Sequence, residues 1–241
     1  MRPRKTLNIA HRGARLLAAE NTLESIRVGF EEGAHGVEFD VQVTADGEPV
    51  LFHDDDLQAL TGVAGQVRRW RWSDLSRLTV TDRLGHRGQI PHLSEVIELL
   101  EGQRGLFNLE LKVVEDSARD LVSAVARLME QVEPEPWVLS SFSKTALDFS
   151  ALQLPDLRRG ALIDDDPGCD FWPIISGELD LSPYAALHPH GLLAERLTGR
   201  ELPLNVWTLN HPRHWERAIE LGVHGIITDD PGGLARFLCA P

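Results

Sequence analysis

The stretch Gly36-Val37-Glu38-Phe39-Asp40-Val41-Gln42-Val43 alternates apolar residues with polar or small ones along its whole length. A period of two predicts a β-strand whose two sides face different surroundings. The turn residues Ala45-Asp46-Gly47 and the apolar run Pro49-Val50-Leu51-Phe52 come next, so the two runs predict a hairpin or a sharp corner. The polar side of the first strand is strongly acidic, because it carries Glu38 and Asp40.

Short apolar runs alternate with helical patterns on both sides of this strand. The positions counted as strand members are Leu7, Val37, Leu106, Val138, Gly160, Leu179, Leu204 and Gly225. Strands that alternate with helices predict a parallel sheet, and eight such units in 241 residues predict an α/β fold of the (β/α)8 TIM-barrel type. A doubly wound sheet is the alternative, disfavoured because no G-x-G-x-x-G turn follows the first strand.

The individual elements follow from the same patterns. Helices are predicted from Asn21-Thr22 to Gly33, over 94–101, over about 116–131 and from Pro231 to Leu238, and the later strands near 137–142, 158–163, 179–183, 204–209 and 224–228. Residues 55–92 have no clean period and predict a small cap-like insertion with a short helix after Ser73. We therefore expect one barrel domain over residues 1–241.

Composition excludes several classes of partner and compartment. The formal net charge of −13 and the pI near 5.2 argue against a nucleic-acid binder, whose binding face must be basic. No window approaches the ~18 consecutive apolar residues of a membrane span, so no stable membrane association is expected. Residues 1–8 lack the apolar segment of a secretory signal peptide. Cys169 and Cys239 are too few for a disulfide framework and are expected as buried thiols, which favours the cytoplasm.

Polar residues gather where the predicted strands end, which is where barrel enzymes carry their chemistry. They are His11-Arg12, Glu38, Asp40, His53-Asp54, Glu110, Lys112, Ser140-Ser141, Asp164, Trp207, Asn210 and Thr228-Asp229. The two serines lack the glycine context of a nucleophile elbow, so serine hydrolase chemistry is not expected.

Three acidic residues form a candidate metal site. Glu38 and Asp40 lie two residues apart on one strand and share a face, and Glu110 and Lys112 do so on another. Carboxylates inside a barrel are costly unless they are paired or bind a metal. Oxygen ligands from Glu38, Asp40 and Glu110 suit a hard divalent cation, Mg²⁺ or Ca²⁺. The alternative is that a carboxylate points to solvent or pairs with Lys112 or Arg12.

Two histidines complete the candidate site. His11 and His53 follow neighbouring strand runs, and such a pair suits general acid and base catalysis near neutral pH. Arg12 and Lys112 add fixed positive charge beside them. Imidazoles, a divalent cation and two cationic side chains together suit an anion that gains charge in the transition state, which indicates a phosphate ester.

The same residues belong to motifs that resemble those of glycerophosphodiester phosphodiesterases. These motifs are His11-Arg12-Gly13, Glu20-Asn21-Thr22, His53-Asp54, Asn108-Leu109-Glu110-Leu111-Lys112, Ser140-Ser141-Phe142 and residues 33–41, 90–96, 206–210 and 222–231. They cover almost the whole chain, in order and with compatible spacing. The resemblance implies a TIM-type barrel and a divalent-metal phosphodiesterase.

The resemblance also implies roles for single residues. Glu38, Asp40 and Glu110 match the metal ligands, His11 and His53 the acid/base pair, Arg12 and Lys112 the phosphate-contacting cations, and residues 55–92 a cap beside the site. Trp207 matches an aromatic residue that lines the alcohol pocket, although a packed core indole is the alternative. Asn21 is expected to order the first loop or cap the helix. Ala59 stands where members often have an arginine, which points to a weakened ion pair near the site.

Three clusters are interpreted as structural. His188-Pro189-His190 is expected in a loop that could reach the barrel mouth, and the acidic runs 54–56 and 164–166 are expected as helix starts or solvated loops, with only Asp54 inside a motif. The resulting prediction is hydrolysis of a small glycerophosphodiester to sn-glycerol 3-phosphate and an alcohol, with His11 as base and His53 as acid. The alternatives are a related barrel phosphodiesterase acting on lysophospholipids and a non-catalytic barrel that binds a phosphate ligand.

Overall fold

A nearly closed ring of eight parallel strands forms the centre of the molecule in the computed structural model, which describes residues 6–240. The strands are β1 (Leu7–His11), β2 (Gly36–Val43), β6 (Leu106–Leu111), β7 (Trp137–Ser141), β8 (Arg158–Ile163), β9 (Ala186–Pro189), β10 (Asn205–Val206) and β11 (Gly225–Thr228). They pair in the order β10-β11-β1-β2-β6-β7-β8-β9, and a parallel bridge between Leu187 and Leu204 joins the two ends. The predicted (β/α)8 barrel is confirmed, and the doubly wound alternative is wrong.

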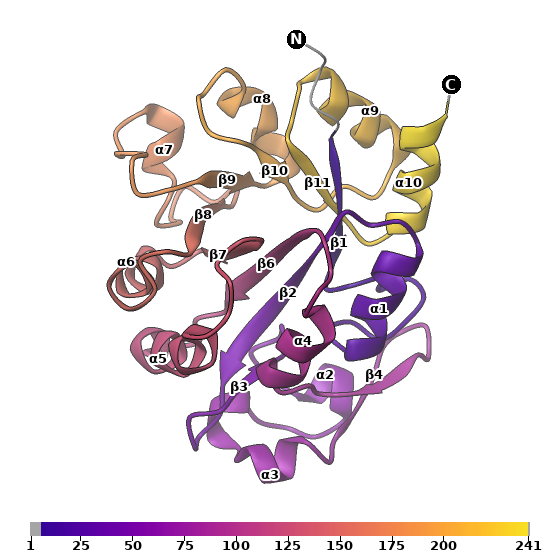
Figure 1. Ribbon diagram of the computed structural model, residues 1–241, viewed down its shortest axis with the longest axis vertical. Helices are drawn as coiled ribbons and strands as arrows, with labels where there is room; N and C mark the ends of the chain where they lie inside the picture. Colours follow the sequence, from indigo (N-terminus) through magenta and orange to yellow (C-terminus); the bar gives the residue numbers. More distant parts are fainter. Residues whose placement is uncertain (1–5, 241) are drawn as a thin grey trace.

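Helices surround the strands (Figure 1). They are α1 (Leu23–Glu31), α4 (Leu93–Leu100), α5 (Ala118–Met129), α6 (Lys144–Gln153), α7 (Pro173–Ser176), α8 (Ala194–Leu197), α9 (Pro212–Glu220) and α10 (Pro231–Cys239), with a 3₁₀ turn at Gly191–Leu193. The side chain of Thr22 accepts the backbone N–H of Ser25 and so caps α1. Gly13 precedes this cap with a φ of +80°, and a Cβ there would lie 2.3 Å from the backbone of Ser25. Only glycine fits at this position, because the loop after β1 passes so close to the backbone of α1.

Alternation along each strand separates the helix-facing core from the barrel interior. In β6, Phe107 and Leu109 belong to the large apolar core beneath the helices. Asn108 and Glu110 point to the opposite side, into the barrel, and both are buried. The strands therefore bring polar side chains into the interior at the positions that the alternation predicts.

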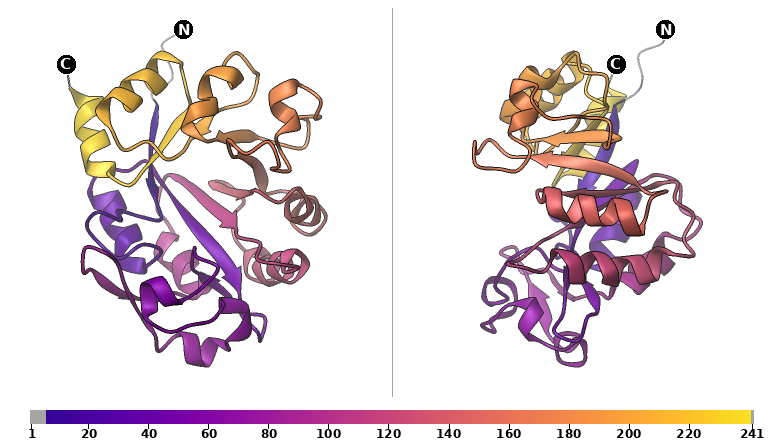
Figure 2. Two further views of the ribbon diagram at one scale, coloured as in Figure 1. Left: turned by 180° about the vertical axis from the view of Figure 1, so that it is seen from behind. Right: turned by 90° about the vertical axis from the view of Figure 1, so that its left-hand side faces the viewer.

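Residues 52–92 leave the barrel after β3 (Pro49–Leu51), which pairs antiparallel with β2 as the predicted hairpin requires. This insertion contains α2 (Gln58–Thr61), a 3₁₀ turn at Val67–Arg69, α3 (Trp72–Leu75) and the hairpin of β4 (Thr79–Thr81) and β5 (Arg87–Gln89). It has its own apolar cluster, built on Phe52, Leu57, Leu75 and Ile90. Both views in Figure 2 place it at the lower end of the molecule. Ala59 is exposed on α2.

The predicted strand at 179–183 is wrong, because the strand in this part of the chain is β9, at Ala186–Pro189. Residues 179–183 form a turn in which Asp180 accepts hydrogen bonds from the backbone and side chain of Ser182. The interpretation of His188-Pro189-His190 as a loop is also wrong for its first two residues. His188 is fully buried within β9, and Gly160 on β8 leaves the room that its ring occupies. β10 is shorter than the predicted 204–209.

The cysteine prediction needs one correction. Both thiols are free, but Cys169 is only half-buried and Cys239 is exposed, so they are not a buried pair. Cys239 is exposed because it ends α10 at the edge of the molecule. Within the described residues, no helix combines the length and the apolar character needed to cross a membrane. The expectation about a signal peptide concerns mainly residues 1–5, which lie outside the described residues.

Candidate active site

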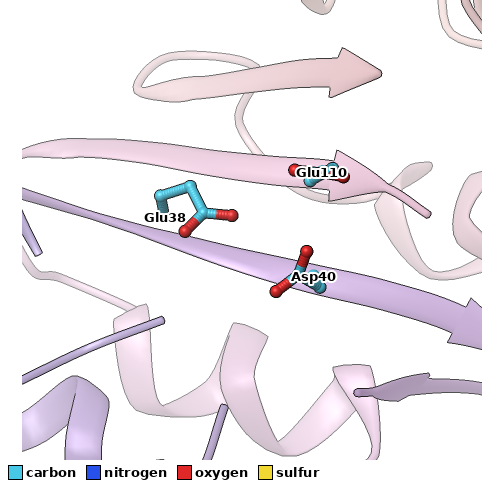
Figure 3. A group of neighbouring side chains, drawn as sticks. All are labelled: Glu38, Asp40 and Glu110. Carbon is cyan, nitrogen blue, oxygen red and sulfur yellow. The ribbon is translucent and has the colours of Figure 1, made fainter. Parts of the chain in front are cut away.

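Three buried carboxylates meet inside the barrel. Glu38 and Asp40 come from β2, and Glu110 comes from the neighbouring β6, where it pairs in register with Asp40 (Figure 3). One oxygen from each residue lies within 4.8 Å of an oxygen of the other two. The structure thus brings together the three residues that the sequence analysis selected as a metal site.

Mutual repulsion and burial perturb the carboxyl groups. Burial, together with the charges of Asp40 and Glu110, raises the pKa of Glu38 well above its usual value. Burial and Asp40 raise the pKa of Glu110 to about 7. Burial also works against the charge of Asp40, but Arg12, His53, Lys112 and the hydrogen bond from Asn21 together outweigh it and hold the pKa of that carboxyl below its usual value. A cluster of this kind fits a divalent cation, which would stabilise all three groups as anions.

The loop after β1 fixes Asp40 in place. The Nδ2 of Asn21 donates to the Asp40 carboxylate at 2.9 Å, and the Oδ1 of Asn21 accepts the backbone N–H of Asp40 at 3.1 Å. Arg12 Nε lies 3.1 Å from Asp40 Oδ2, and Arg12 Nη1 donates to Glu20 at 2.7 Å. Asn21 therefore acts on the acidic cluster, while Thr22 takes the capping role.

His11 is oriented by a carboxylate from the far end of the chain. Its Nδ1 lies 2.6 Å from Asp229 Oδ1, and its Nε2 lies 4.0 Å from Glu38. Asn210 donates to the other oxygen of Asp229 at 2.7 Å and accepts the backbone N–H of Asp229 through its Oδ1. Burial lowers the pKa of His11 despite the hydrogen bond that its Nδ1–H donates to Asp229, so its ring is neutral near pH 7.

His53 is held in a similar way from the opposite side. Its Nδ1 lies 2.8 Å from Asp54 Oδ1, and its Nε2 lies 3.0 Å from Lys112 Nζ. The hydrogen bond from His53 lowers the pKa of Asp54, and this carboxyl stays ionised. Lys112 also lies 3.6 Å from Glu110, so one ammonium contacts both the second histidine and the acidic cluster.

Both histidines, Arg12, Lys112 and two of the three carboxylates line one cavity of about 240 Å³. Its lining includes His11, Arg12, Glu38, His53, Asn108, Glu110, Lys112, Phe142, Leu162, Asp164, Trp207 and Ile227. Trp207 is half-buried, and its edge contacts the rings of Phe142 and His190, with centroids 5.5 and 5.2 Å away. Its indole N–H donates to the carbonyl of His188 at 2.7 Å. The indole is therefore anchored in the barrel and lines the cavity at the same time.

The sequence analysis missed two positioning contacts. Asp229 and Asn210 appear there only as polar strand ends, although together they orient His11. Asn21 appears only as a loop or cap residue, although it bonds to Asp40 at two points. Asp229 directly follows β11, and the last strand of a closed barrel lies next to the first. This strand order could have predicted that Asp229 lies near His11.

Comparison with known proteins agrees with this geometry. Residues 11–233 match the model of the glycerophosphoryl diester phosphodiesterase family. A glycerophosphodiester phosphodiesterase of Caldanaerobacter subterraneus is 32% identical over 97% of this chain and 98% of that protein. A crystal structure of a family member from Silicibacter pomeroyi matches with a TM-score of 0.86 at 27% identity, over 97% of this chain and 93% of the other.

A second solved structure adds a ligand. A phosphodiesterase of Oleispira antarctica, solved in complex with the product sn-glycerol 3-phosphate, matches with a TM-score of 0.82 at 26% identity over 96% of both chains. The shared barrel and the family match over nearly the full length of the chain lead to one conclusion. This chain belongs to the glycerophosphoryl diester phosphodiesterase family.

Proposed function

We propose that this protein hydrolyses small glycerophosphodiesters to sn-glycerol 3-phosphate and a free alcohol, with Glu38, Asp40 and Glu110 holding Mg²⁺ or Ca²⁺. The observation that carries the proposal is that two carboxylate-backed imidazoles share one cavity with Glu38 and Glu110 of this acidic cluster. The family match and the product complex of the Oleispira relative support the choice of substrate.

The acidic cluster fits a hard cation. It offers only oxygen ligands, all three residues are buried, and burial and crowding raise the pKa values of two of them. When bound, such a cation supplies Lewis-acid stabilisation of the phosphoryl oxygens and a fixed point for orienting the ester.

The two histidines are assigned opposite roles. His11 acts as the general base. Asp229 accepts a hydrogen bond from its Nδ1–H, and the lone pair on Nε2 is therefore free to take a proton from the nucleophile, which is either water or a glycerol hydroxyl of the substrate. Burial, which lowers the pKa of His11, keeps that lone pair available at neutral pH. His53, with a proton on each ring nitrogen, acts as the general acid. Its Nδ1–H stays on Asp54 while its Nε2–H protonates the leaving oxygen, and Lys112 then contacts the phosphoryl group instead of Nε2.

The remaining lining residues bind the ester. Lys112 and Arg12 carry positive charge into the cavity and contact the phosphoryl oxygens, where charge develops in the transition state. The pKa of Arg12 is raised because Asp40 and Glu20 outweigh the opposing effect of burial, so it stays charged. Trp207 lines the pocket for the alcohol, together with Phe142. The aromatic faces suit an apolar or quaternary ammonium alcohol such as choline.

Turnover of glycerophosphocholine, coupled to a glycerol 3-phosphate dehydrogenase, tests the proposal. We expect His11→Ala and His53→Ala each to lower kcat by at least ~10²-fold, since general acid–base catalysis contributes about 10²- to 10⁴-fold. His214→Ala, an exposed histidine on α9, is the matched control and should keep wild-type turnover. Near-normal turnover of either site variant under saturating Mg²⁺ or Ca²⁺ would contradict the assigned role.

The same assay separates the alternatives. A lysophospholipid phosphodiesterase would turn over lysophosphatidylcholine in preference to glycerophosphocholine, and a non-catalytic barrel would turn over neither. We further infer that residues 55–92 cap the site of a single barrel domain and that the protein works in the reducing cytoplasm. The free thiols of Cys169 and Cys239 support the latter inference.

A further inference from the structure

Asn108 lies beside the acidic cluster on the inner face of β6. It precedes Glu110 by two residues on β6 and shares its inward face, and it pairs in register with Glu38 on β2. Its side chain lines the same cavity as the two histidines. Because β6 runs toward the mouth of the barrel, Asn108 lies one inward-facing position deeper than Glu110.

The amide of Asn108 is fully buried, yet within residues 6–240 neither its Oδ1 nor its Nδ2 has a hydrogen-bond partner. Such a group is costly, because burial removes the hydrogen bonds that water would make. The amides of Asn21, Asn205 and Asn210 behave differently, since each bonds to protein groups through both its oxygen and its nitrogen. Asn108 is therefore an orphaned donor and acceptor facing the cavity.

The surroundings of Asn108 restrict what it can bind. The carboxylates of its neighbours Glu38 and Glu110 only accept hydrogen bonds, and neither bonds to the amide. A phosphoryl oxygen could also satisfy only the N–H side of the amide, whereas a hydroxyl both donates and accepts. Leu162 and Ile227 line the same cavity and offer apolar contact to carbon atoms. A neutral, hydroxyl-bearing carbon chain matches this combination.

We propose that Asn108 binds a hydroxyl of the glycerol moiety and selects glycerol as one alcohol of the diester. This inference rests on the proposed function, because it takes a glycerophosphodiester as the substrate. It fixes the orientation of the ester in the cavity. Glycerol lies against Asn108, Leu162 and Ile227, the phosphoryl group lies between His11, His53 and Lys112, and the second alcohol lies toward Trp207.

Binding of the product and of a hydroxyl-free analogue tests the inference without any chemical step. We would measure by calorimetry, in Mg²⁺, the dissociation constants of sn-glycerol 3-phosphate and n-propyl phosphate. Wild-type protein should bind glycerol 3-phosphate at least about tenfold more tightly, because a site built around a hydroxyl disfavours ligands that lack one. Asn108→Leu, which keeps the size of the side chain and removes the amide, should reduce this ratio at least about fivefold.

Ser140→Ala is the matched control. Ser140 on β7 is also buried with an unpartnered side-chain oxygen, but it is not among the residues that line the cavity. Its ratio should equal that of the wild type. A wild-type ratio near one, or an unchanged ratio in Asn108→Leu, would overturn the inference. If Asn108→Leu does not fold, Asn108→Ala takes its place and must show the same loss.

Parallel turnover of glycerophosphocholine by the wild type separates this inference from the proposed function. Hydrolysis with an unchanged binding ratio in Asn108→Leu rejects the role of Asn108 and leaves the function standing. A ratio that depends on Asn108, without any hydrolysis, rejects the catalytic function and supports recognition of the glycerol group.

Discussion

The amide of Asn21 bonds to Asp40 at two points, through its Nδ2 to the carboxylate at 2.9 Å and through its Oδ1 to the backbone N–H at 3.1 Å. Asn21 adopts a left-handed backbone with a φ of 54°, a conformation that asparagine tolerates better than most residues. One residue therefore both turns the loop after β1 and orients a proposed metal ligand. Metal affinity should depend on its side chain.

We expect Asn21→Gly to weaken Mg²⁺ binding by about 10- to 100-fold, the usual effect of losing a group that orients a metal ligand. Glycine is the appropriate substitution, because it removes the amide without straining the left-handed backbone. Glu115→Gly provides the control, since Glu115 also has a positive φ, 51°, and its exposed side chain pairs with Arg68 and not with the acidic cluster. Calorimetric titration with Mg²⁺ measures the effect, and equal affinity in both variants would contradict the role given to Asn21.

Asp229→Asn should lower kcat by about 10²- to 10⁴-fold with little change in folding. The amide can no longer hold the proton of His11 on Nδ1 with the same preference, so the base is misoriented or in the wrong tautomer. Asp156→Asn, an exposed residue before β8, serves as the control and should leave turnover unchanged. Steady-state kinetics and a thermal melt on each variant distinguish lost orientation from lost structure; full activity in Asp229→Asn would be incompatible with our assignment.

Exhaustive chelation should abolish activity, and Mg²⁺ or Ca²⁺ should restore it. In Glu38→Gln, we expect the concentration of cation needed for activity to rise strongly, because one of three anionic ligands is lost. Without cation, the same variant should be at least as stable as the wild type, since burial and then repulsion from Asp40 and Glu110 disfavour a carboxylate at this position. Thermal melts with and without Mg²⁺ measure both effects, with exposed Glu24→Gln as the control. Activity that survives chelation would reject the metal site.

Stability should fall as the pH drops from 6.5 toward about 3, because of His188. Burial, with a smaller contribution from His224, lowers the pKa of His188 in the folded protein from 6.5 to about 3. In this window the unfolded chain binds a proton that the folded protein does not, so acid favours unfolding. From these two pKa values we expect this residue to reduce the free energy of unfolding by about 2 kcal/mol between pH 7 and pH 5.

Urea unfolding at pH 7 and pH 5 measures this effect. In His188→Gln the drop in stability should be smaller than in the wild type, although the variant is less stable at pH 7. Exposed His214→Ala should show the wild-type drop. If His188→Gln and the wild type lost the same stability over this range, another group would be responsible.

The barrel and the acidic cluster could be predicted from the sequence because both follow from alternation within single strands. In β2 and β6, a polar residue at every second position fixes which side chains face inward, so Glu38, Asp40 and Glu110 converge once the strands are adjacent. These three carboxylates come together as soon as β2 and β6 are neighbours. Contacts between residues far apart in sequence, such as His11 and Asp229, can be placed only when the whole fold is known.

The prediction of a strand at 179–183, in place of β9, fails for a related reason. Leu179 and Leu181 imitate strand alternation but flank a turn, where they pack against the core from outside the sheet. The true strand is only four residues long and carries a histidine and a proline. His188 is acceptable inside the barrel because Asn205 donates to its ring and Gly160 leaves space for it, and both residues lie on other strands.

The pairing of β1 with β11 has a consequence for biosynthesis. His11 and Asp229 are 218 residues apart in sequence, and they meet only when the first strand has docked beside the last. A ribosome-bound chain that has not yet exposed β11 carries most of the proposed site but lacks the carboxylate that orients its base. Hydrolytic competence should therefore arise only once β11 has emerged and docked, and a product truncated before Asp229 should be inert.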